Sequence, residues 1–234
     1  MSLKLYCNDM SPPSRAVLMT AGALALQMDL HQVNIYGKDL DTDFLKVSAA
    51  DTRAPYAINP QHSVPTLVDG DFTIWDSHAI VGYLVGQHGS DDLYPKETKP
   101  RASVDQFLHF DSGVLYPRVN TIINSIVVEN SKEISTKNIS AITESYKFLD
   151  TFLQSKNYLA GPSLTVADLC CVATVSTATI ITPISTEKYP NLSTWYRTCK
   201  NLPFYEETNG AGLNKLDALV ELKLGRPRTK DFCE

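Results

Sequence analysis

The spacing of hydrophobic positions changes along the chain, and the change divides it into two parts. In the first part, residues 3–7 and 30–35 are short, largely apolar runs of the kind found in β-strands. Between them, residues 15–26 carry apolar side chains at helical spacing and follow a Ser-Pro-Pro sequence suited to a helix start. Strand, helix and strand in this order form a βαβ unit, so the chain is expected to begin with an α/β layer.

The predicted α/β layer continues with a hairpin and a second helix. Residues 64–68 and 72–75 flank an Asp-Gly-Asp turn, a pattern that favours a β-hairpin. Residues 77–85 follow as a helix, with Ser77 or Asp76 as the expected N-cap.

The second part of the chain is helical in pattern. Apolar residues recur at helical spacing, and no segment from residue 100 to residue 222 clearly indicates a strand. The predicted helices cover residues 107–126, 142–153, 164–177, 192–201 and 213–222. We therefore predict an α/β domain over residues 1–86, a linker over 87–99 and an all-helical domain over 100–234.

Two local signals refine the helical part. Pro117 lies inside the first long helix, where a missing N–H predicts a kink. Thr165 and Asp168 have the spacing of a capping box at the start of the predicted 164–177 helix. That helix is almost wholly apolar, so it is expected to be central and buried. The residues after Gly225 are expected to form a mobile tail.

Composition narrows the class of protein. The 234 residues carry a net charge of −5, which argues against nucleic acid or an anionic membrane as the main partner. No apolar run approaches the roughly 20 residues of a membrane span, and the N-terminus lacks an apolar signal core. The five cysteines form no CxxC pair and the five histidines no HExxH motif. These features predict a cytoplasmic protein without a metal or other cofactor.

Four segments carry the specific signal: residues 11–15 (SPPSR), 59–67 (NPQHSVPTL), 76–80 (DSHAI) and 159–168 (LAGPSLTVAD). Their order and spacing resemble cytosolic glutathione transferases, most closely the insect epsilon and delta classes, over essentially the whole chain. The resemblance implies a thioredoxin-like N-terminal domain, an all-helical C-terminal domain and a homodimer. It also implies conjugation of glutathione, as co-substrate, to hydrophobic electrophiles in xenobiotic detoxification.

Within this resemblance, Ser11 is the predicted catalytic residue. Its hydroxyl, at a helix N-terminus that favours negative charge, would donate a hydrogen bond to the thiolate of glutathione. Such sites lower the pKa of a thiol from about 8.5 toward 7 or below. The simpler alternative is that Ser11 only caps the helix. Ser14 and Tyr6 are competing hydroxyls, whereas Cys7 is not at the position where the thiol-transferring classes carry a cysteine.

The resemblance assigns five residues to glutathione binding. A cis bond before Pro65 would turn the backbone of Val64 toward the cysteinyl part of the tripeptide, and His62 would donate to its glycine carboxylate. Ser77 would hold the γ-glutamyl carboxylate at a helix N-terminus, and Asp76 would pair with the γ-glutamyl ammonium. The alternatives are an ordinary trans proline, an exposed loop histidine and a capping carboxylate.

The sequence departs from the family pattern at two places. Asp39 stands where the family commonly has a histidine, so Lys38 is a candidate replacement for that contact. Residues 47–57 form an apparent insertion next to His62. The insertion could cover the glutathione site, and its Arg53 is a second candidate to replace the missing histidine contact. A solvated loop is the simpler interpretation of the insertion.

The helical domain supplies the expected electrophile pocket. The candidates are Tyr116, Arg118, Val119 and Ile122 on the first long helix, with Phe204 and Tyr205 closing the pocket from the C-terminal side. Helical core packing is the alternative for Val119 and Ile122. Two other functions remain open on the same scaffold: a non-catalytic carrier of a steroid or haem, and a glutathione-dependent peroxidase or isomerase.

Overall fold

A computed structural model describes residues 3–36, 58–89 and 91–225. Its sheet contains β1 (Lys4–Cys7), β2 (Asp29–Gln32), β3 (Thr66–Asp69) and β4 (Phe72–Trp75) in the order β2-β1-β3-β4. β1 pairs in parallel with β2 and antiparallel with β3, and β3 and β4 form the predicted hairpin. The predicted strands are confirmed, although β2 begins and ends earlier than the 30–35 run.

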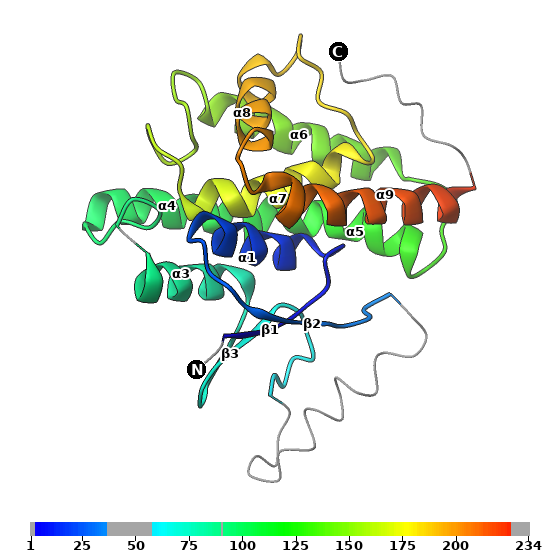
Figure 1. The fold of residues 1–234 in the computed structure, drawn as a ribbon. Coiled ribbons are helices and arrows are strands. Elements are labelled where there is room, and N and C mark those ends of the chain that lie inside the picture. The colour runs from blue at the N-terminus through cyan, green and yellow to red at the C-terminus, as the bar shows by residue number, and fades with distance from the viewer. Residues whose placement is uncertain (1–2, 37–57, 90, 226–234) are drawn as a thin grey trace.

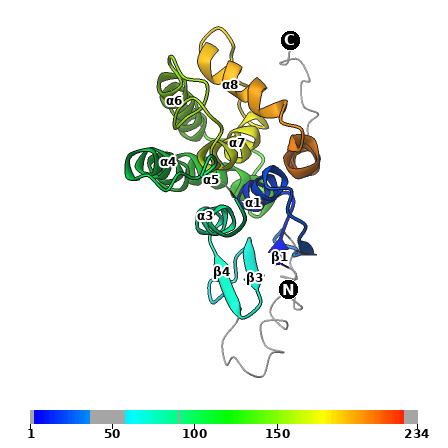
Figure 2. The same cartoon turned by 60° about the vertical axis from the view of Figure 1, so that its left-hand side comes forward.

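Two helices separate this sheet from the rest of the molecule. The first helix, α1, spans Pro12–Ala23, and α3 spans Ser77–His88. Both lie between the sheet and the helical part, as Figure 1 shows, and Figure 2 shows the sheet, this helix pair and the remaining helices as successive layers. This arrangement confirms the expected thioredoxin-like N-terminal fold.

The remaining helices confirm the all-helical second part. They are α4 (Thr98–Phe110), α5 (Tyr116–Val127), α6 (Thr136–Phe152), α7 (Val166–Thr179), α8 (Pro190–Lys200) and α9 (Ala211–Leu224). Two π-helical turns interrupt the pattern: η1 (Asp111–Leu115) lies between α4 and α5, and η2 (Glu206–Gly210) leads into α9. None of the helices in the described ranges is long and apolar enough to cross a membrane.

The region around Pro117 contains a wider turn rather than one continuous helix. Pro117 lies in the first turn of α5, immediately after η1. Proline lacks a backbone N–H, and a π turn is one way in which a helix absorbs a break in its hydrogen-bond ladder. The regular helix is therefore interrupted near Pro117, but by an inserted π turn and not by the predicted kink in one continuous helix.

The centre of the fold is α7, as the apolar run at 164–177 predicts. Every residue from Val166 to Ala178 is buried. The helix packs against α1 and α3 on one side and against α4, α5 and α8 on others. A helix that is apolar on all faces is stable only when it is enclosed in this way.

The capping box at the start of α7 is also confirmed. One carboxylate oxygen of Asp168 accepts the Thr165 backbone N–H at 3.0 Å. The other accepts the Leu159 backbone N–H and the Trp195 indole N–H, both at 2.9 Å. Asp168 has no exposed surface, so this one carboxylate connects the preceding loop, α7 and α8 inside the core.

We predict that Asp168→Ala lowers the free energy of unfolding by about 3 kcal/mol, because it leaves buried N–H groups without acceptors. Urea denaturation followed by far-UV circular dichroism measures the change. Asp91→Asn, which removes one partner of an exposed ion pair with Lys96, is the control and should cost no more than about 0.5 kcal/mol. Equal effects of the two substitutions would contradict a special role for Asp168.

Candidate active site

Ser11 lies at the positive end of α1. It occupies the N-cap position and is only 4% exposed, yet its side chain makes no capping hydrogen bond. The backbone N–H groups of a first helical turn have no partners within the helix and favour a nearby anion. Capping alone therefore does not account for Ser11, whose hydroxyl remains at a site with positive potential.

The loop before Ser11 is fixed by its own hydrogen bonds. The side-chain amide of Asn8 donates to the carbonyl of Val33 at 2.8 Å, and the Ser11 N–H donates to the Asn8 carbonyl at 2.9 Å. The Asn8 N–H donates to the Ser14 hydroxyl at 3.2 Å. Ser14 is therefore engaged in holding this loop, which leaves Ser11 as the better-placed hydroxyl.

Helix α9 covers the same loop from the other side. A Cβ on Gly212 would lie 2.0 Å from the carbonyl oxygen of Asp9, so only glycine permits this close approach. Lys215, one turn further along α9, forms an ion pair with the Asp9 carboxylate. The last helix thus fixes the position of the segment that presents Ser11.

Tyr6 and Cys7, the other candidates near this site, are buried within the sheet. The Tyr6 ring packs on His31 with centroids 5.1 Å apart. Burial, with Asp9 adding to it, raises the pKa of the Cys7 thiol to about 11. Neither residue lines the cavity that contains Ser11.

That cavity has a volume of about 240 Å³ and lies where the α/β layer meets the helical part. Its lining comes from α1, the segment after β2, the loop before β3, α5 and α7: Ser11, Pro12, Ile35, Tyr36, Ser63, Val64, Tyr116, Val119, Asn120, Ile123, Asn124 and Thr177. The candidates from the sequence did not include the other eight lining residues: Pro12, Ile35, Tyr36, Ser63, Asn120, Ile123, Asn124 and Thr177. Asn120 was detectable as the residue one helical turn after Tyr116, but no local signal points to Thr177.

The loop before β3 delivers Val64 to the cavity. The Val64–Pro65 peptide bond is cis, as predicted. The buried Asn59 holds the loop, since its amide donates to the Ser63 carbonyl at 2.9 Å and to the Thr66 hydroxyl at 2.9 Å. His62 is exposed on this loop and does not line the cavity.

The predicted electrophile residues separate into two groups. Tyr116 and Val119 line the cavity, and burial raises the pKa of Tyr116 to about 12, so its hydroxyl is a hydrogen-bond donor at neutral pH. Ile122 is fully buried and lies in the core instead, in agreement with the alternative of helical packing. Arg118 does not line the cavity: it donates to Ser145 at 2.9 Å and pairs with Glu144 at 2.8 Å on α6.

The two C-terminal candidates are also outside the cavity lining. Phe204 packs against Gly22 of α1. Tyr205 is 3% exposed and lies in the core. Helical periodicity does not reveal which face of α5 meets the cavity, and the segment at 204–205 turns toward α1 because Gly22 leaves space for the Phe204 ring.

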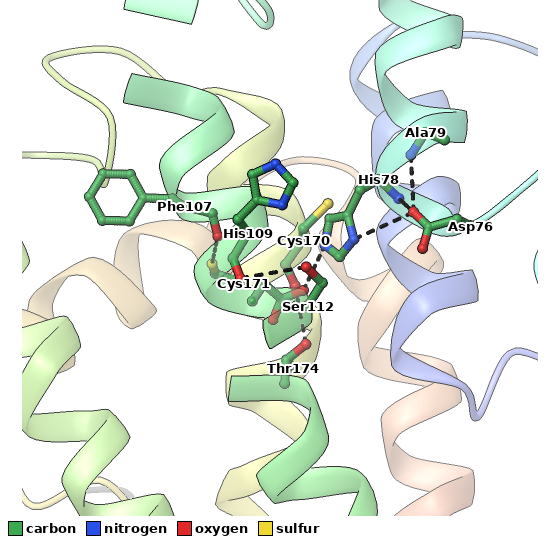
Figure 3. A network of polar contacts seen from close by, with 10 residues as sticks. Asp76, His78, Ala79, Phe107, His109, Ser112, Cys170, Cys171 and Thr174 are labelled. Atoms are coloured by element: carbon green, nitrogen blue, oxygen red, sulfur yellow. Dashed lines mark hydrogen bonds and ion pairs between the residues drawn. The ribbon is translucent and has the colours of Figure 1, made fainter. Parts of the chain in front are cut away.

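The predicted contacts for the γ-glutamyl end of glutathione lie at the start of α3, outside the lining of this cavity. Asp76 is the N-cap, with φ of 72°, and its carboxylate accepts the N–H groups of His78 at 2.9 Å and Ala79 at 3.2 Å. Ser77 is buried in the first turn. An exposed carboxylate and a helix N-terminus therefore stand side by side, and Figure 3 shows Asp76 on the outer side of the His78 ring.

His78, which was not among the candidates from the sequence, joins Asp76 to the helical part. Its Nε2 lies 3.0 Å from Oδ2 of the buried Asp111 in η1, and its Nδ1 lies 3.7 Å from Oδ1 of Asp76. Burial opposes a charge on the ring, but Cys170 and the hydrogen-bonded carboxylates of Asp111 and Asp76 raise the pKa of His78 above its ordinary value. In return, hydrogen bonding from His78 lowers the pKa of Asp76. Cys170 of α7 lies on the inner side (Figure 3).

Several predicted features cannot be placed. Lys38, Asp39, Arg53 and the 47–57 insertion lie outside the described residues. The segment after Gly225 does so as well. Within the described ranges, no group of three or more His, Cys, Asp or Glu side chains is arranged to hold a metal ion.

Comparison with known proteins identifies the family. The glutathione S-transferase N-terminal domain matches residues 10–87, and the corresponding C-terminal domain matches residues 102–203. Glutathione S-transferase 1 of Manduca sexta is 41% identical over 228 residues, covering 96% of this chain and all of the relative. The chain therefore belongs to the glutathione S-transferase family.

Solved structures of insect relatives agree with this assignment. An epsilon-class glutathione S-transferase from the housefly, Musca domestica, is 42% identical with a TM-score of 0.86, over 95% of this chain and 98% of that one. A glutathione transferase homologue from Drosophila mojavensis, solved with bound glutathione, is 38% identical with a TM-score of 0.86, over 95% and 97%.

We predict that Asp111→Asn lowers the free energy of unfolding more at pH 6 than at pH 9. A histidine whose pKa is raised by folding contributes stability that is complete below its unfolded pKa of about 6.5 and is lost as the pH rises through its folded pKa. Without Asp111, burial of a charged His78 becomes unfavourable, so the difference from the wild type is largest in acid. Urea denaturation at both pH values measures it.

The matched control for this prediction is Asp91→Asn, which does not contact His78. NMR titration of the His78 ring provides a direct second measurement. A His78 ring that titrates at the ordinary histidine pKa of about 6.5, or an Asp111→Asn cost that is the same at both pH values, would contradict the assignment.

Proposed function

We propose that this protein conjugates the thiol of glutathione to hydrophobic electrophiles, with Ser11 as the residue that stabilises the thiolate. The observation that carries the proposal is the buried Ser11 hydroxyl, which is not used in capping and lines a cavity shared by both parts of the fold. A cavity that combines the positive end of α1 with side chains of α5 suits a reaction between an anionic nucleophile and an apolar partner.

The main requirement of the reaction is that the protein stabilises the negative charge on the glutathione sulfur. The thiol of glutathione loses its proton to solvent, and the resulting thiolate accepts a hydrogen bond from Ser11. Its sulfur then forms the new bond to the electrophilic atom. In a substitution the leaving group departs with the electron pair of its broken bond, and in an addition the displaced π-electron pair takes a proton from solvent. Each unit by which the thiol pKa falls corresponds to about 1.4 kcal/mol in favour of the thiolate.

We place the tripeptide along the surface between Ser11 and α3. The backbone of Val64, which lines the cavity beside Ser11, pairs with the cysteinyl unit. Ser77 and the first turn of α3 hold the γ-glutamyl carboxylate, while Asp76 pairs with the ammonium group. His62, on the same loop as Val64, is the proposed contact for the glycine carboxylate.

We place the electrophile against α5. Tyr116 and Val119 line the cavity opposite Ser11, and the newly identified Ile35, Tyr36 and Ile123 extend its apolar wall. Residues 1–86 thus bind glutathione and residues 100–234 supply most of the electrophile site. Detoxification of xenobiotics, a cytoplasmic location and a homodimer complete the proposal, in line with the sequence resemblance.

We predict that Ser11→Ala raises the pKa of the bound glutathione thiol by about one unit or more, because the thiolate loses its hydrogen-bond donor. Thiolate absorbance of the enzyme–glutathione complex, titrated against pH, measures the shift. Tyr6→Phe removes the competing hydroxyl on β1 and is the matched control, with an expected thiol pKa equal to that of the wild type.

Two results would speak against this role. A lowered thiol pKa that survives Ser11→Ala but not Tyr6→Phe would transfer the role to Tyr6. Tight glutathione binding with an ordinary thiol pKa in the wild type would indicate a non-catalytic carrier on the same scaffold.

We predict that Tyr116→Ala raises KM for a bulky aromatic electrophile by about tenfold, the usual effect of losing one large apolar contact. KM for glutathione should stay within about twofold, because the tripeptide is bound on the other side. Arg118→Gln is the control: the Arg118 side chain contacts α6, so the substitution should affect stability and leave both KM values unchanged. Equal effects of the two variants on KM would contradict this placement of the electrophile.

A further inference from the structure

One charged side chain of the core is not explained by the proposed reaction. Arg15 lies on α1, one turn after Ser11, and its backbone N–H donates to the Ser11 carbonyl at 3.0 Å. Its side chain has no exposed surface. It extends away from the sheet toward α7 and η2, so the guanidinium lies between the two parts of the fold.

All the hydrogen-bond acceptors of this guanidinium are neutral. Nη1 donates to the Asn209 amide oxygen at 2.6 Å and to the Ser176 hydroxyl at 3.2 Å. Nη2 donates to the Thr177 hydroxyl and to the Ala173 carbonyl. Nε has no hydrogen-bond partner within the part of the chain that the structure describes.

The surrounding titratable groups do not neutralise this charge. Within the described residues, the titratable side chains that act on the guanidinium are those of Tyr205, Tyr36, Tyr196 and Asp9, and the Asp9 carboxylate is already paired with Lys215. Burial lowers the pKa of the guanidinium to about 10, opposed by these neighbours, so Arg15 is still charged at neutral pH. Burial raises the pKa of Tyr36 and Tyr205, which keeps both phenols neutral.

A buried cation without a counter-ion is unfavourable, and a neutral side chain could fill the same space at lower cost. The position of the charge suggests what offsets this cost. Thr177, which accepts from Nη2, lines the same cavity as Ser11, so the guanidinium lies directly behind the cavity wall. In a low-dielectric interior, a fixed charge next to a reacting site acts strongly on an anion formed there.

We propose that Arg15 is a positioning residue for the reaction: a buried cation, held by neutral acceptors behind Thr177, that stabilises the thiolate formed beside Ser11. The inference rests on the proposed function and extends it. Ser11 supplies the hydrogen bond, α1 supplies its positive end, and Arg15 supplies a full charge whose counter-ion is the thiolate of the bound substrate itself. Because the cation is in place before glutathione binds, no reorganisation is needed when the proton leaves.

The alternative is that Arg15 is only a structural clamp between α1, α7 and η2. The neighbouring Asn209 allows the two roles to be separated. Asn209→Asp keeps the acceptor that receives Nη1 and places a carboxylate beside the guanidinium, while it loses the hydrogen bond that the Asn209 amide donates to Ser176 at 3.2 Å. The contact between Arg15 and residue 209 is thus retained while the charge is neutralised. Asn209→Ala has the opposite effect, because it weakens the clamp and leaves the charge uncompensated.

The experiment is a pH titration of thiolate absorbance for the enzyme–glutathione complex, together with the melting temperature of each variant. For Asn209→Asp we expect a thiol pKa about one unit higher than in the wild type, a tenfold change in the ionisation equilibrium, with an unchanged or higher melting temperature. Asn209→Ala should melt at a lower temperature with the wild-type thiol pKa. Arg15→Gln should raise the thiol pKa as Asn209→Asp does, and Arg15→Lys should restore most of the shift.

A wild-type thiol pKa in Asn209→Asp would overturn the proposal, even if Arg15→Gln fails to fold. A rise in Asn209→Ala equal to that in Asn209→Asp would also overturn it, in favour of the clamp. Ser11→Ala, measured alongside, separates this failure from failure of the proposed function. If the thiol pKa rises in Ser11→Ala but not in Asn209→Asp, only the role of Arg15 is rejected. If the thiol pKa of bound glutathione is not lowered in the wild type, the proposed function itself is rejected.

Discussion

The burial of α7 is the constraint on which the rest of the structure depends. No residue from Val166 to Ala178 is exposed, so every neighbouring element must supply an apolar face to this helix. Helices α4, α5 and α8 do so from the helical part, and α1 does so from the α/β layer. The contact with α1 joins the two parts of the chain. It also places the N-terminus of α1, and with it Ser11, opposite the cavity wall formed by α5 and Thr177.

The charged side chains near this apolar centre differ in how their charge is met. Asp168 accepts N–H groups from three segments and fixes how the loop and α8 meet α7. His78 and Asp111 form a buried charged pair between α3 and the helical part, where their attraction offsets the loss of hydration. Arg15 differs from both because, in the part of the chain that the structure describes, its guanidinium donates hydrogen bonds to neutral groups only. The proposed thiolate in the cavity would offset this positive charge.

The two π turns coincide with these polar contacts. Turn η1 presents Asp111 to His78 just before Pro117, and η2 presents Asn209 to Arg15 just before Gly212 meets the loop of Asp9. A π turn adds a residue to a helical turn and so changes which side chains face inward. Both turns therefore determine which side chains of the helical part contact the α/β layer, at His78 of α3 and at Arg15 of α1.

The sequence by itself determined the local elements and the motifs. Its periodicity defined the βαβ unit, the hairpin, the buried α7 and the capping box, and the family pattern indicated Ser11, Asp76 and the cis bond before Pro65. These features depend on neighbours a few residues apart. Only the tertiary structure decided that Arg118 and Ile122 lie outside the cavity lining and that Tyr36 and Thr177 belong to it. It alone also showed that, among the described residues, the Arg15 guanidinium donates hydrogen bonds to neutral groups only. Such facts depend on contacts between residues up to 194 positions apart, as for Arg15 and Asn209, and on π turns that shift the inward face of a helix. Periodicity shows that a helix has a buried face, but the partner that packs against that face decides what each buried side chain does.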